Sequence, residues 1–178
     1  MNSEYIDLSA VVLESEGQVF RFDDLRGLLA SEDDLKFKGP VSGELRLSGG
    51  RDELLVSGSV SADIVLQCSR CLGEAVWNVA KSFTGRFRPW EPDMLPAQEE
   101  LGPREADVSW YHDDFLDIKE IFAEQIRLDM PVRFLCDAGC RGLCGMCGCN
   151  RNTETCGCAR EELPGPFAGL GERLAKHQ

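Results

Sequence analysis

The sequence predicts an α+β protein with an antiparallel sheet, one main helix and a cysteine-rich, zinc-stabilised C-terminal element. Apolar residues alternate with polar ones between residues 41 and 88, as in strands with one buried face. A mostly apolar stripe follows at helical spacing between residues 117 and 129. Nine cysteines, of which four successive pairs are separated by only one or two residues, indicate that a metal stabilises part of this chain of 178 residues.

The alternation defines the strands of the predicted sheet. Leu45 and Leu47 flank Arg46 in one strand, and Gly49-Gly50 forms the turn after it. The next two strands each have one apolar face, made by Val56, Val60, Ile64 and Leu66 in the first and by Trp77, Val79, Phe83 and Phe87 in the second. Residues 68–73 connect these two antiparallel strands, so the first cysteine pair is expected at a hairpin tip, a position typical of zinc knuckles.

Prolines and acidic residues break this regularity between residues 89 and 106, which we expect to form an acidic loop. Over the wider range 91–120, ten acidic residues stand against two basic ones. Carboxylates can act as general acids or bases, but an acidic run broken by prolines is more typical of a solvated loop.

The main helix is expected at residues 117–129. Asp117-Ile-Lys-Glu120 has the spacing of a capping box, and Pro131 disfavours helical conformation in the residue before it. The apolar stripe is expected to belong to the core, with a groove for a partner helix as the alternative. Its residues are Ile118, Ile121, Phe122, Gln125 and Leu128.

These elements divide the chain into three expected parts. An α+β domain occupies residues 1–130, a cysteine-rich zinc element at residues 131–160 packs on the hairpin at residues 68–71, and residues 161–178 form a C-terminal tail. The cysteine-rich element has few apolar residues, so a bound metal would have to supply its order.

The cysteines can be divided into two sites of four sulfurs and one leftover thiol. Cys144-Gly-Met-Cys147 has the form of a metal knuckle, and Cys156-Gly-Cys158 offers a second pair for the same site. The other site would contain Cys68, Cys71, Cys136 and Cys140, which leaves Cys149 over. A single site made by Cys68, Cys71, Cys144 and Cys147 also fits the spacings. We expect Zn(II), one or two per chain, with an iron–sulfur cluster as the less favoured alternative.

Composition limits the classes of function. A net charge of −12 argues against a general phosphate-binding surface, because sequence-independent nucleic-acid affinity comes from Lys and Arg. The N-terminus carries acids where a signal peptide would carry bases, and no apolar run is long enough for a membrane span, so we expect a cytoplasmic protein without a membrane partner. The sequence has only two histidines, His112 and His177, so it offers few candidate residues for a histidine-based catalytic triad or for a hydrolase zinc site with mixed ligands.

We therefore expect a protein that is not an enzyme and has no small-molecule substrate. One alternative is a zinc-dependent or dithiol redox enzyme using Cys68-Ser-Arg-Cys71, although a redox dithiol of this type needs a helix N-terminus within a parallel βαβ unit. Another is a zinc-stabilised regulator that acts only through protein contacts.

Two stretches resemble a known family. Cys68-Ser-Arg-Cys71-Leu72 is similar to a Cys-x-Arg-Cys-Leu signature, and the segment from Leu128 and Pro131 through Cys140-Arg-Gly-Leu-Cys144 to Cys156-Gly-Cys158 is similar to a C-terminal cysteine signature. Both belong to the YceD-like large-ribosomal-RNA-subunit accumulation protein family. Gly145 stands where proline is usual, Cys149 is additional, and the tail Pro166-Phe-Ala-Gly-Leu170 only loosely resembles the family's ending.

The resemblance implies a non-enzymatic factor that supports accumulation or processing of the 23S RNA. Its partner would be a ribosomal protein or a pre-ribosomal ribonucleoprotein, and the acidic residues at 91–120 would attract a basic protein. The cysteine-rich segment is locally the least acidic, with four arginines against two acids at residues 131–160. Local RNA contact is therefore expected near Arg70, Arg133, Arg141 and Arg151.

Overall fold

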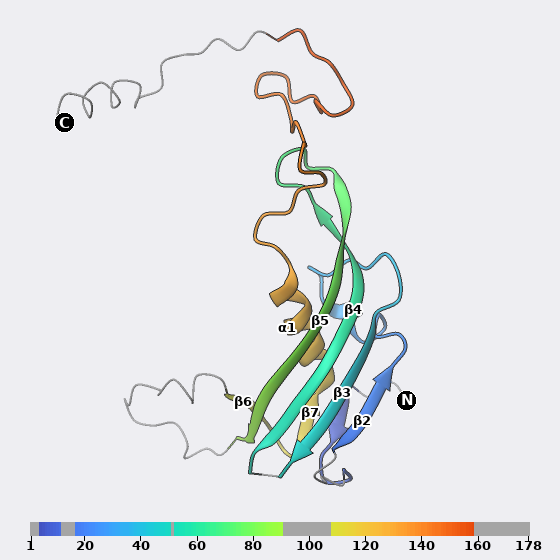
Figure 1. Ribbon diagram of the computed structural model, residues 1–178, viewed down its shortest axis with the longest axis vertical. Coiled ribbons are helices and arrows are strands. Elements are labelled where there is room, and N and C mark those ends of the chain that lie inside the picture. The colour runs from blue at the N-terminus through green and yellow to red at the C-terminus, as the bar shows by residue number, and fades with distance from the viewer. Residues whose placement is uncertain (1–3, 12–16, 51, 91–107, 159–178) are drawn as a thin grey trace, which may run out of the picture.

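A twisted five-stranded sheet with one helix on its inner face forms the body of the protein. The computed structural model describes residues 4–11, 17–50, 52–90 and 108–158 (Figure 1). The strands are β1 (Tyr5–Asp7), β2 (Gln18–Phe22), β3 (Ser42–Gly49), β4 (Leu54–Gln67), β5 (Glu74–Pro89), β6 (Val108–Tyr111) and β7 (Phe115–Asp117). The helix α1 spans Ile118–Asp129, and a short 3-10 turn, η1, spans Leu29–Ser31.

The large sheet has the order β2-β3-β4-β5-β6, and its first four strands are antiparallel as the alternation predicts. Gly49, with φ of 101°, begins the turn between β3 and β4. The inward residues of β4 include Val56, Val60 and Ile64, all of them buried. The predicted α+β class is confirmed. Two parts of the sheets were not expected: β6, which pairs parallel to β5, and the separate two-stranded sheet of β1 and β7.

The helix begins and ends where its capping signals predict. The Asp117 carboxylate accepts a hydrogen bond of 2.9 Å from the backbone N–H of Glu120, and α1 stops at Asp129 with Met130 extended before Pro131. The expectation that Leu128 is a core residue is wrong, because its side chain is 63% exposed. Ile126 is buried instead, since it lies one helical turn after Phe122 on the same face.

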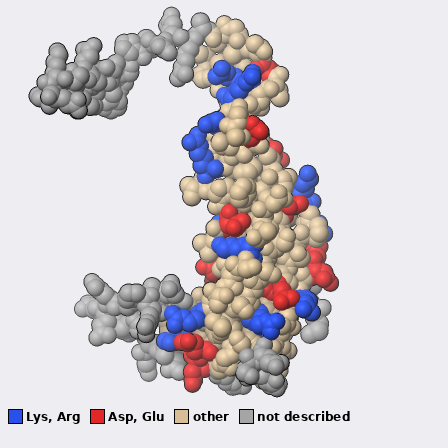
Figure 2. All heavy atoms as spheres, viewed as in Figure 1, with Lys and Arg blue, Asp and Glu red and all other residues tan. Residues whose placement is uncertain are grey.

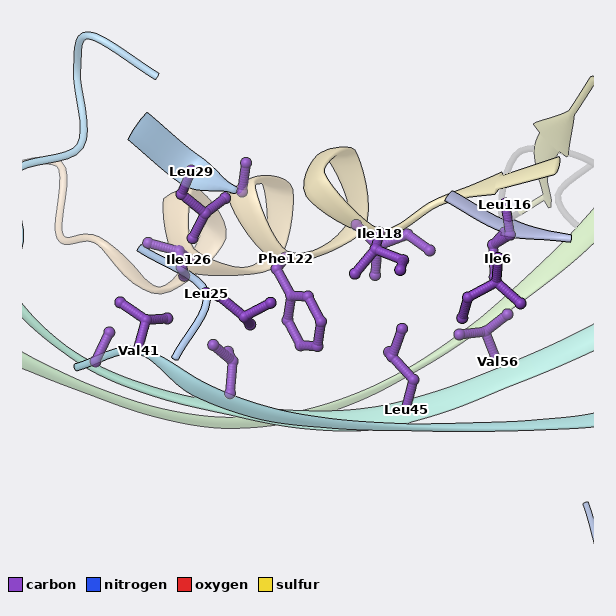
Figure 3. Packing of buried hydrophobic residues seen from close by; sticks show 14 of the residues in the cluster. Ile6, Leu25, Leu29, Val41, Leu45, Val56, Leu116, Ile118, Phe122 and Ile126 are labelled. Carbon is purple, nitrogen blue, oxygen red and sulfur yellow. The ribbon is translucent and has the colours of Figure 1, made fainter. Parts of the chain in front are cut away.

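Phe122 anchors the helix to the sheet. Its fully buried ring lies edge-on to Phe22 and Phe83, with centroids 5.6 and 6.2 Å away. A Cβ at Gly43 of β3 would stand 2.6 Å from the Phe122 ring, so the absence of a side chain there permits this close approach. Figure 3 shows Phe122 pointing from α1 toward the sheet beside Leu25.

The strands β4 and β5 extend past the helix as a long hairpin, and the cysteine-rich segment lies at the tip of that hairpin (Figure 1). Most of the predicted acidic loop, residues 91–106, and all of the predicted tail lie outside the described residues. The division into domains stays a prediction. Among the described residues, no helix has both the length and the apolar character to cross a membrane.

Candidate metal centres

Four sulfurs from two distant parts of the chain converge at the hairpin tip. The ligand atoms of Cys68, Cys71, Cys136 and Cys140 all lie within 4.8 Å of one another, and we call this group the hairpin tetrad. The Sγ atoms of Cys68 and Cys140 are 3.8 Å apart, and those of Cys71 and Cys136 are 3.6 Å apart. Sulfurs at about 2.3 Å from a tetrahedral Zn(II) are about 3.8 Å from each other. The tetrad therefore has the dimensions of a four-thiolate zinc site.

A tight turn between β4 and β5 presents the first two sulfurs. The Cys68 N–H donates to the Gly73 carbonyl at 2.8 Å, and the Leu72 N–H donates to the Cys68 carbonyl at 3.0 Å. Leu72 closes the turn in the left-handed region, with φ of 59°. The backbone N–H of Arg70 points at the Cys68 Sγ from 3.4 Å, so an amide stabilises this sulfur as a thiolate.

Hydrogen bonds join the hairpin tip to the segment after α1. The Ser69 N–H donates to the Phe134 carbonyl at 2.8 Å, and the Arg70 Nη1 donates to the Cys140 carbonyl at 3.0 Å. The Leu143 N–H donates to the Arg70 carbonyl at 3.1 Å. The two halves of the tetrad are thus held together by the chain itself as well as by any ion bound between them.

The pKa values within the hairpin tetrad diverge. Backbone N–H groups of Cys136, Cys71 and Arg70 lower the pKa of Cys68 to about 6, whereas the sulfurs of Cys71 and Cys140 raise the pKa of Cys136 to about 12. The Gly73 amide lowers the pKa of Cys71, but burial and the Cys68 sulfur outweigh it and raise that pKa overall. Neighbouring thiolates repel each other, so four cannot ionise together without a cation. A divalent cation would remove that repulsion.

A second group of sulfurs forms beyond the hairpin tetrad. The ligand atoms of Cys144, Cys147, Cys149 and Cys156 lie within 4.8 Å of one another, and we call this group the knuckle tetrad. The Gly148 N–H donates to the Cys144 carbonyl at 2.9 Å, with Gly148 at φ of 75°, which closes the expected two-residue knuckle. The Cys144 N–H donates to the Cys149 carbonyl at 2.8 Å, and this bond holds Cys149 beside the knuckle.

The knuckle tetrad repeats the electrostatic pattern of the first. Backbone N–H groups of Cys147 and Met146 lower the pKa of Cys144 to about 6. The Cys147 sulfur, with burial as the second cause, raises the pKa of Cys149 to about 12. The Cys147 sulfur likewise raises the pKa of Cys158 to about 12, so Cys158 also interacts with this group although it is not one of the four.

Asn152 connects the two groups. Its side-chain Nδ2 donates to the Cys140 Sγ at 3.3 Å and to the Asn150 Oδ1 at 2.9 Å, and its Oδ1 accepts from the Arg141 N–H at 2.7 Å. The Asn152 hydrogen bond is the largest cause of a lowered pKa at Cys140. A residue from the knuckle loop therefore supports a sulfur of the hairpin tetrad, as groups that hydrogen-bond a metal ligand do in metal sites.

The structure brings eight of the nine cysteines into two groups of four and leaves Cys158 outside both. The hairpin tetrad has the expected members, and three of the knuckle tetrad are the expected Cys144, Cys147 and Cys156. Cys149 stands in the fourth place, where the sequence analysis expected Cys158. The pairs of the single-site alternative, 68 with 71 and 144 with 147, fall into different groups. Spacing alone could not separate Cys149 from Cys158, because both are joined to a neighbouring cysteine through one residue.

Comparisons with known proteins identify the family to which the chain is similar. A family model described as large ribosomal RNA subunit accumulation protein YceD matches residues 56–172, a range that contains all nine cysteines. No solved structure gives a significant match to the chain.

Three relatives represent the similar proteins. The chloroplastic large ribosomal RNA subunit accumulation protein YCED homolog 1 of Arabidopsis thaliana is 25% identical over 163 residues, which cover 78% of this chain and 51% of that protein. Its Zea mays counterpart is 26% identical over 156 residues, covering 74% and 53%. An uncharacterised protein of Mycobacterium tuberculosis is 30% identical over 131 residues, covering 74% and 60%. The chain thus spans between 51% and 60% of the length of these relatives.

Proposed function

The chain belongs to the YceD family of large ribosomal RNA subunit accumulation proteins, and we propose that it is a non-enzymatic cytoplasmic factor for 23S RNA accumulation or processing. It would act by binding a ribosomal protein or a nascent ribonucleoprotein. The observation that carries this proposal is the joining of two cysteine tetrads and several exposed arginines into one projecting element. The family is named for RNA accumulation and not for a catalytic activity.

Zn(II) is the metal that suits both tetrads. Eight thiols in two sets of four, with the hairpin tetrad at zinc-like sulfur spacings, match structural zinc sites, where the protein fills all four positions. In the knuckle tetrad we assign the fourth position to Cys149 and treat Cys158 as a fifth thiol. When bound, the metal would supply the order that this apolar-poor segment cannot supply itself. The hydrogen bonds around the sulfurs hold them in place to receive it.

The proposed contact surface is the cysteine tip, which we define by exposed arginines and exposed apolar residues around the tetrads. These are Arg70, Arg133, Arg141 and Arg151 together with Leu72, Val132 and Met146. Figure 2 shows basic side chains on this narrow upper part of the molecule. Among the described residues, no ion pair involves Arg133, Arg141 or Arg151, so these three guanidinium groups are available to phosphates or carboxylates of a partner.

The enzymatic alternatives are less well supported by the geometry. Cys68 and Cys71 lie between antiparallel strands and not at a helix N-terminus, where a redox dithiol of this kind is activated. A catalytic zinc keeps one position open for water, whereas each tetrad offers four sulfurs. A zinc-stabilised regulator of another protein would differ from our proposal only in the identity of the partner.

A complementation assay tests the proposal. In cells that lack this gene, the ratio of large-subunit to small-subunit RNA should fall, and the natural chain should restore it. The variant Arg133→Ser/Arg141→Ser/Arg151→Ser should fold and bind metal but fail to restore the ratio. The matched control is Arg21→Ser/Arg26→Ser/Arg88→Ser, which removes exposed arginines of the sheet domain and should restore it. Full restoration by the tip variant would refute the proposed role of the cysteine tip.

A further inference from the structure

An open groove lies beside α1, at the end of the body that bears β6 and β7. Its volume is about 1140 Å³, and its lining residues include Tyr5 of β1, Trp110 of β6, Phe115 of β7, and Glu120, Glu124 and Leu128 of α1. We call it the acidic groove. Pockets for small molecules usually enclose roughly 300 to 1,000 Å³, so this open and larger groove better fits a peptide segment.

Exposed apolar side chains are concentrated among the residues that line the acidic groove. Tyr5, Trp110, Phe115 and Leu128 are 46%, 39%, 47% and 63% exposed, and they are half of the eight large hydrophobic side chains exposed within the described residues. Single exposed hydrophobic residues are ordinary, but several in one groove mark an interaction site. Leu128 lies at the end of α1, is exposed and is not part of the hydrophobic core, so core packing does not account for an apolar side chain at this position.

The aromatic rings of the groove are held in position before any partner binds. Tyr5 and Phe115 lie edge-on with centroids 6.4 Å apart, and Trp110 lies edge-on to Trp90 at 6.0 Å. Rings fixed in this way lose little conformational entropy on binding. They can therefore serve as anchors for apolar side chains of a partner.

The charged residues that line the acidic groove are mostly negative. Four carboxylates line it, from Asp113, Asp117, Glu120 and Glu124, with Arg127 as the only lysine or arginine among its lining residues. The Arg127 guanidinium already forms ion pairs with Glu32 and, at 2.7 Å, with Asp34. The groove thus attracts cations and repels phosphates.

The sequence next to β6 adds to this charge. Residues 91–107, which lie outside the described part of the chain, carry six acidic residues against one arginine and join directly to β6. The same charge would concentrate a basic partner near the groove.

We propose that the acidic groove binds a basic segment of a partner protein, in which apolar side chains alternate with lysines or arginines at helical or strand spacing. The apolar side chains would rest on Trp110, Phe115 and Leu128. The cationic side chains would meet Glu120 and Glu124, which lie one helical turn apart and are both exposed. This inference rests on the proposed function, since ribosome assembly offers basic protein segments, and it assigns protein binding to a surface remote from the cysteine tip.

A defined pair of synthetic peptides tests the inference on the purified full chain loaded with zinc. Both peptides have leucines at helical spacing, and their remaining positions are lysines in one and glutamates in the other. Fluorescence anisotropy should show binding of the lysine peptide that weakens as salt rises, and no binding of the glutamate peptide.

Matched variants locate the binding. Leu128→Ser/Glu124→Gln should weaken the lysine peptide about tenfold, because it removes one apolar contact and one charge from the groove. The control Leu55→Ser/Glu154→Gln changes an exposed leucine on the opposite face of the sheet and an exposed glutamate on the cysteine tip, and should leave affinity within about twofold.

Three results would overturn the inference: no binding of the lysine peptide, equal weakening by both double variants, or displacement of the lysine peptide by a peptide of residues 159–178, which would make the chain's own tail the occupant. No RNA readout enters this assay. Its failure is therefore distinguishable from failure of the complementation assay, which probes the cysteine tip.

Discussion

The side-chain Nδ2 of Asn152 lies 3.3 Å from the Sγ of Cys140, so the knuckle loop donates a hydrogen bond to a sulfur of the hairpin tetrad. The two tetrads are therefore structurally connected. Ordering of the knuckle loop places Asn152, and Asn152 lowers the pKa of Cys140. Metal binding at one group should consequently favour metal binding at the other.

Replacing the side-chain amide of Asn152 should weaken zinc binding at the hairpin tetrad. We expect Asn152→Ala to lower the zinc affinity of this tetrad by about tenfold or more, which is the usual effect of losing a group that hydrogen-bonds a metal ligand. Competition with a chromophoric chelator measures this. The matched control is Asn78→Ala, an exposed asparagine on β5 that bonds Asp63 and touches no sulfur. Equal zinc affinity in the natural chain and Asn152→Ala would show that the Asn152 contact is incidental.

The divergent pKa values predict how many protons zinc displaces. The pKa of Cys68 is lowered to about 6, so this thiol is already largely ionised near neutral pH, and zinc binding to the hairpin tetrad should release fewer than four protons. The number of protons released is measured by calorimetric titration with zinc in buffers of different ionisation enthalpy. The titration uses the variant Cys144→Ser/Cys147→Ser, which lacks two thiols of the knuckle tetrad. Release close to four protons would mean that the sulfurs are not organised before the metal binds.

The same shifts predict a pH dependence for the metal-free chain. The pKa of Cys68 is lowered on folding from 9.0 to about 6, so its thiolate stabilises the fold fully above the unfolded value. That contribution is lost as pH falls through about 6. Denaturant titrations of the metal-free chain should therefore show stability falling from pH 9 to pH 6, and Cys68→Ser should flatten this slope. An unchanged slope in Cys68→Ser would contradict the assignment.

Single serine variants decide which thiol completes the knuckle tetrad. We expect Cys149→Ser to lose tight zinc binding at this group and Cys158→Ser to retain it, because only Cys149 shares the mutual 4.8 Å spacing. Zinc per chain, measured after dialysis, reports the difference. The reverse result would support the ligand set expected from sequence spacing, with Cys149 as the spare thiol.

The helix contact predicts a large loss of stability in one core variant. Phe122→Ala should lower the free energy of unfolding by about 3 to 5 kcal/mol, since it empties a fully buried site between α1 and the sheet. Leu55→Ala, at a side chain that is 40% exposed, is the comparison and should cost far less. Urea unfolding measures both, and similar losses would show that the Phe122 site collapses around the cavity.

Local signals in the sequence were sufficient for most of the fold. Period-two alternation gave β3, β4 and β5, and the carboxylate of Asp117 with Pro131 gave both ends of α1. The parallel strand β6 and the β1–β7 pair could not be foreseen, because strands of three or four residues carry too little periodicity and their pairing is non-local. Leu128 was wrongly assigned to the core because, at the end of a helix, the spacing alone does not decide whether a residue at the edge of the apolar stripe faces the core or the solvent.

The candidate site was predictable to the extent that ligand type and turn spacing define it. Those two features predicted a metal site and allowed the division into two groups, but they also allowed a single site. The fourth member of the knuckle tetrad depends on the Cys144–Cys149 backbone bond, which the spacing does not reveal. The role of Asn152 also depends on the packing of one loop against another. The acidic groove is lined by residues of β1, β6, β7 and α1, so no pattern within one stretch of the sequence predicts it.

We infer that two closed thiolate sites, each filled by one zinc ion, order the cysteine tip. Native mass spectrometry of the full chain, with metal quantified on the same sample, tests it most directly. We predict two zinc ions per chain. When a chelator removes the metal, an NMR spectrum of the same sample should show the amide resonances of residues 131–158 leaving their folded positions. A purified chain that carries no zinc, and whose amide resonances do not move when the chelator is added, would show that no metal orders the cysteine tip.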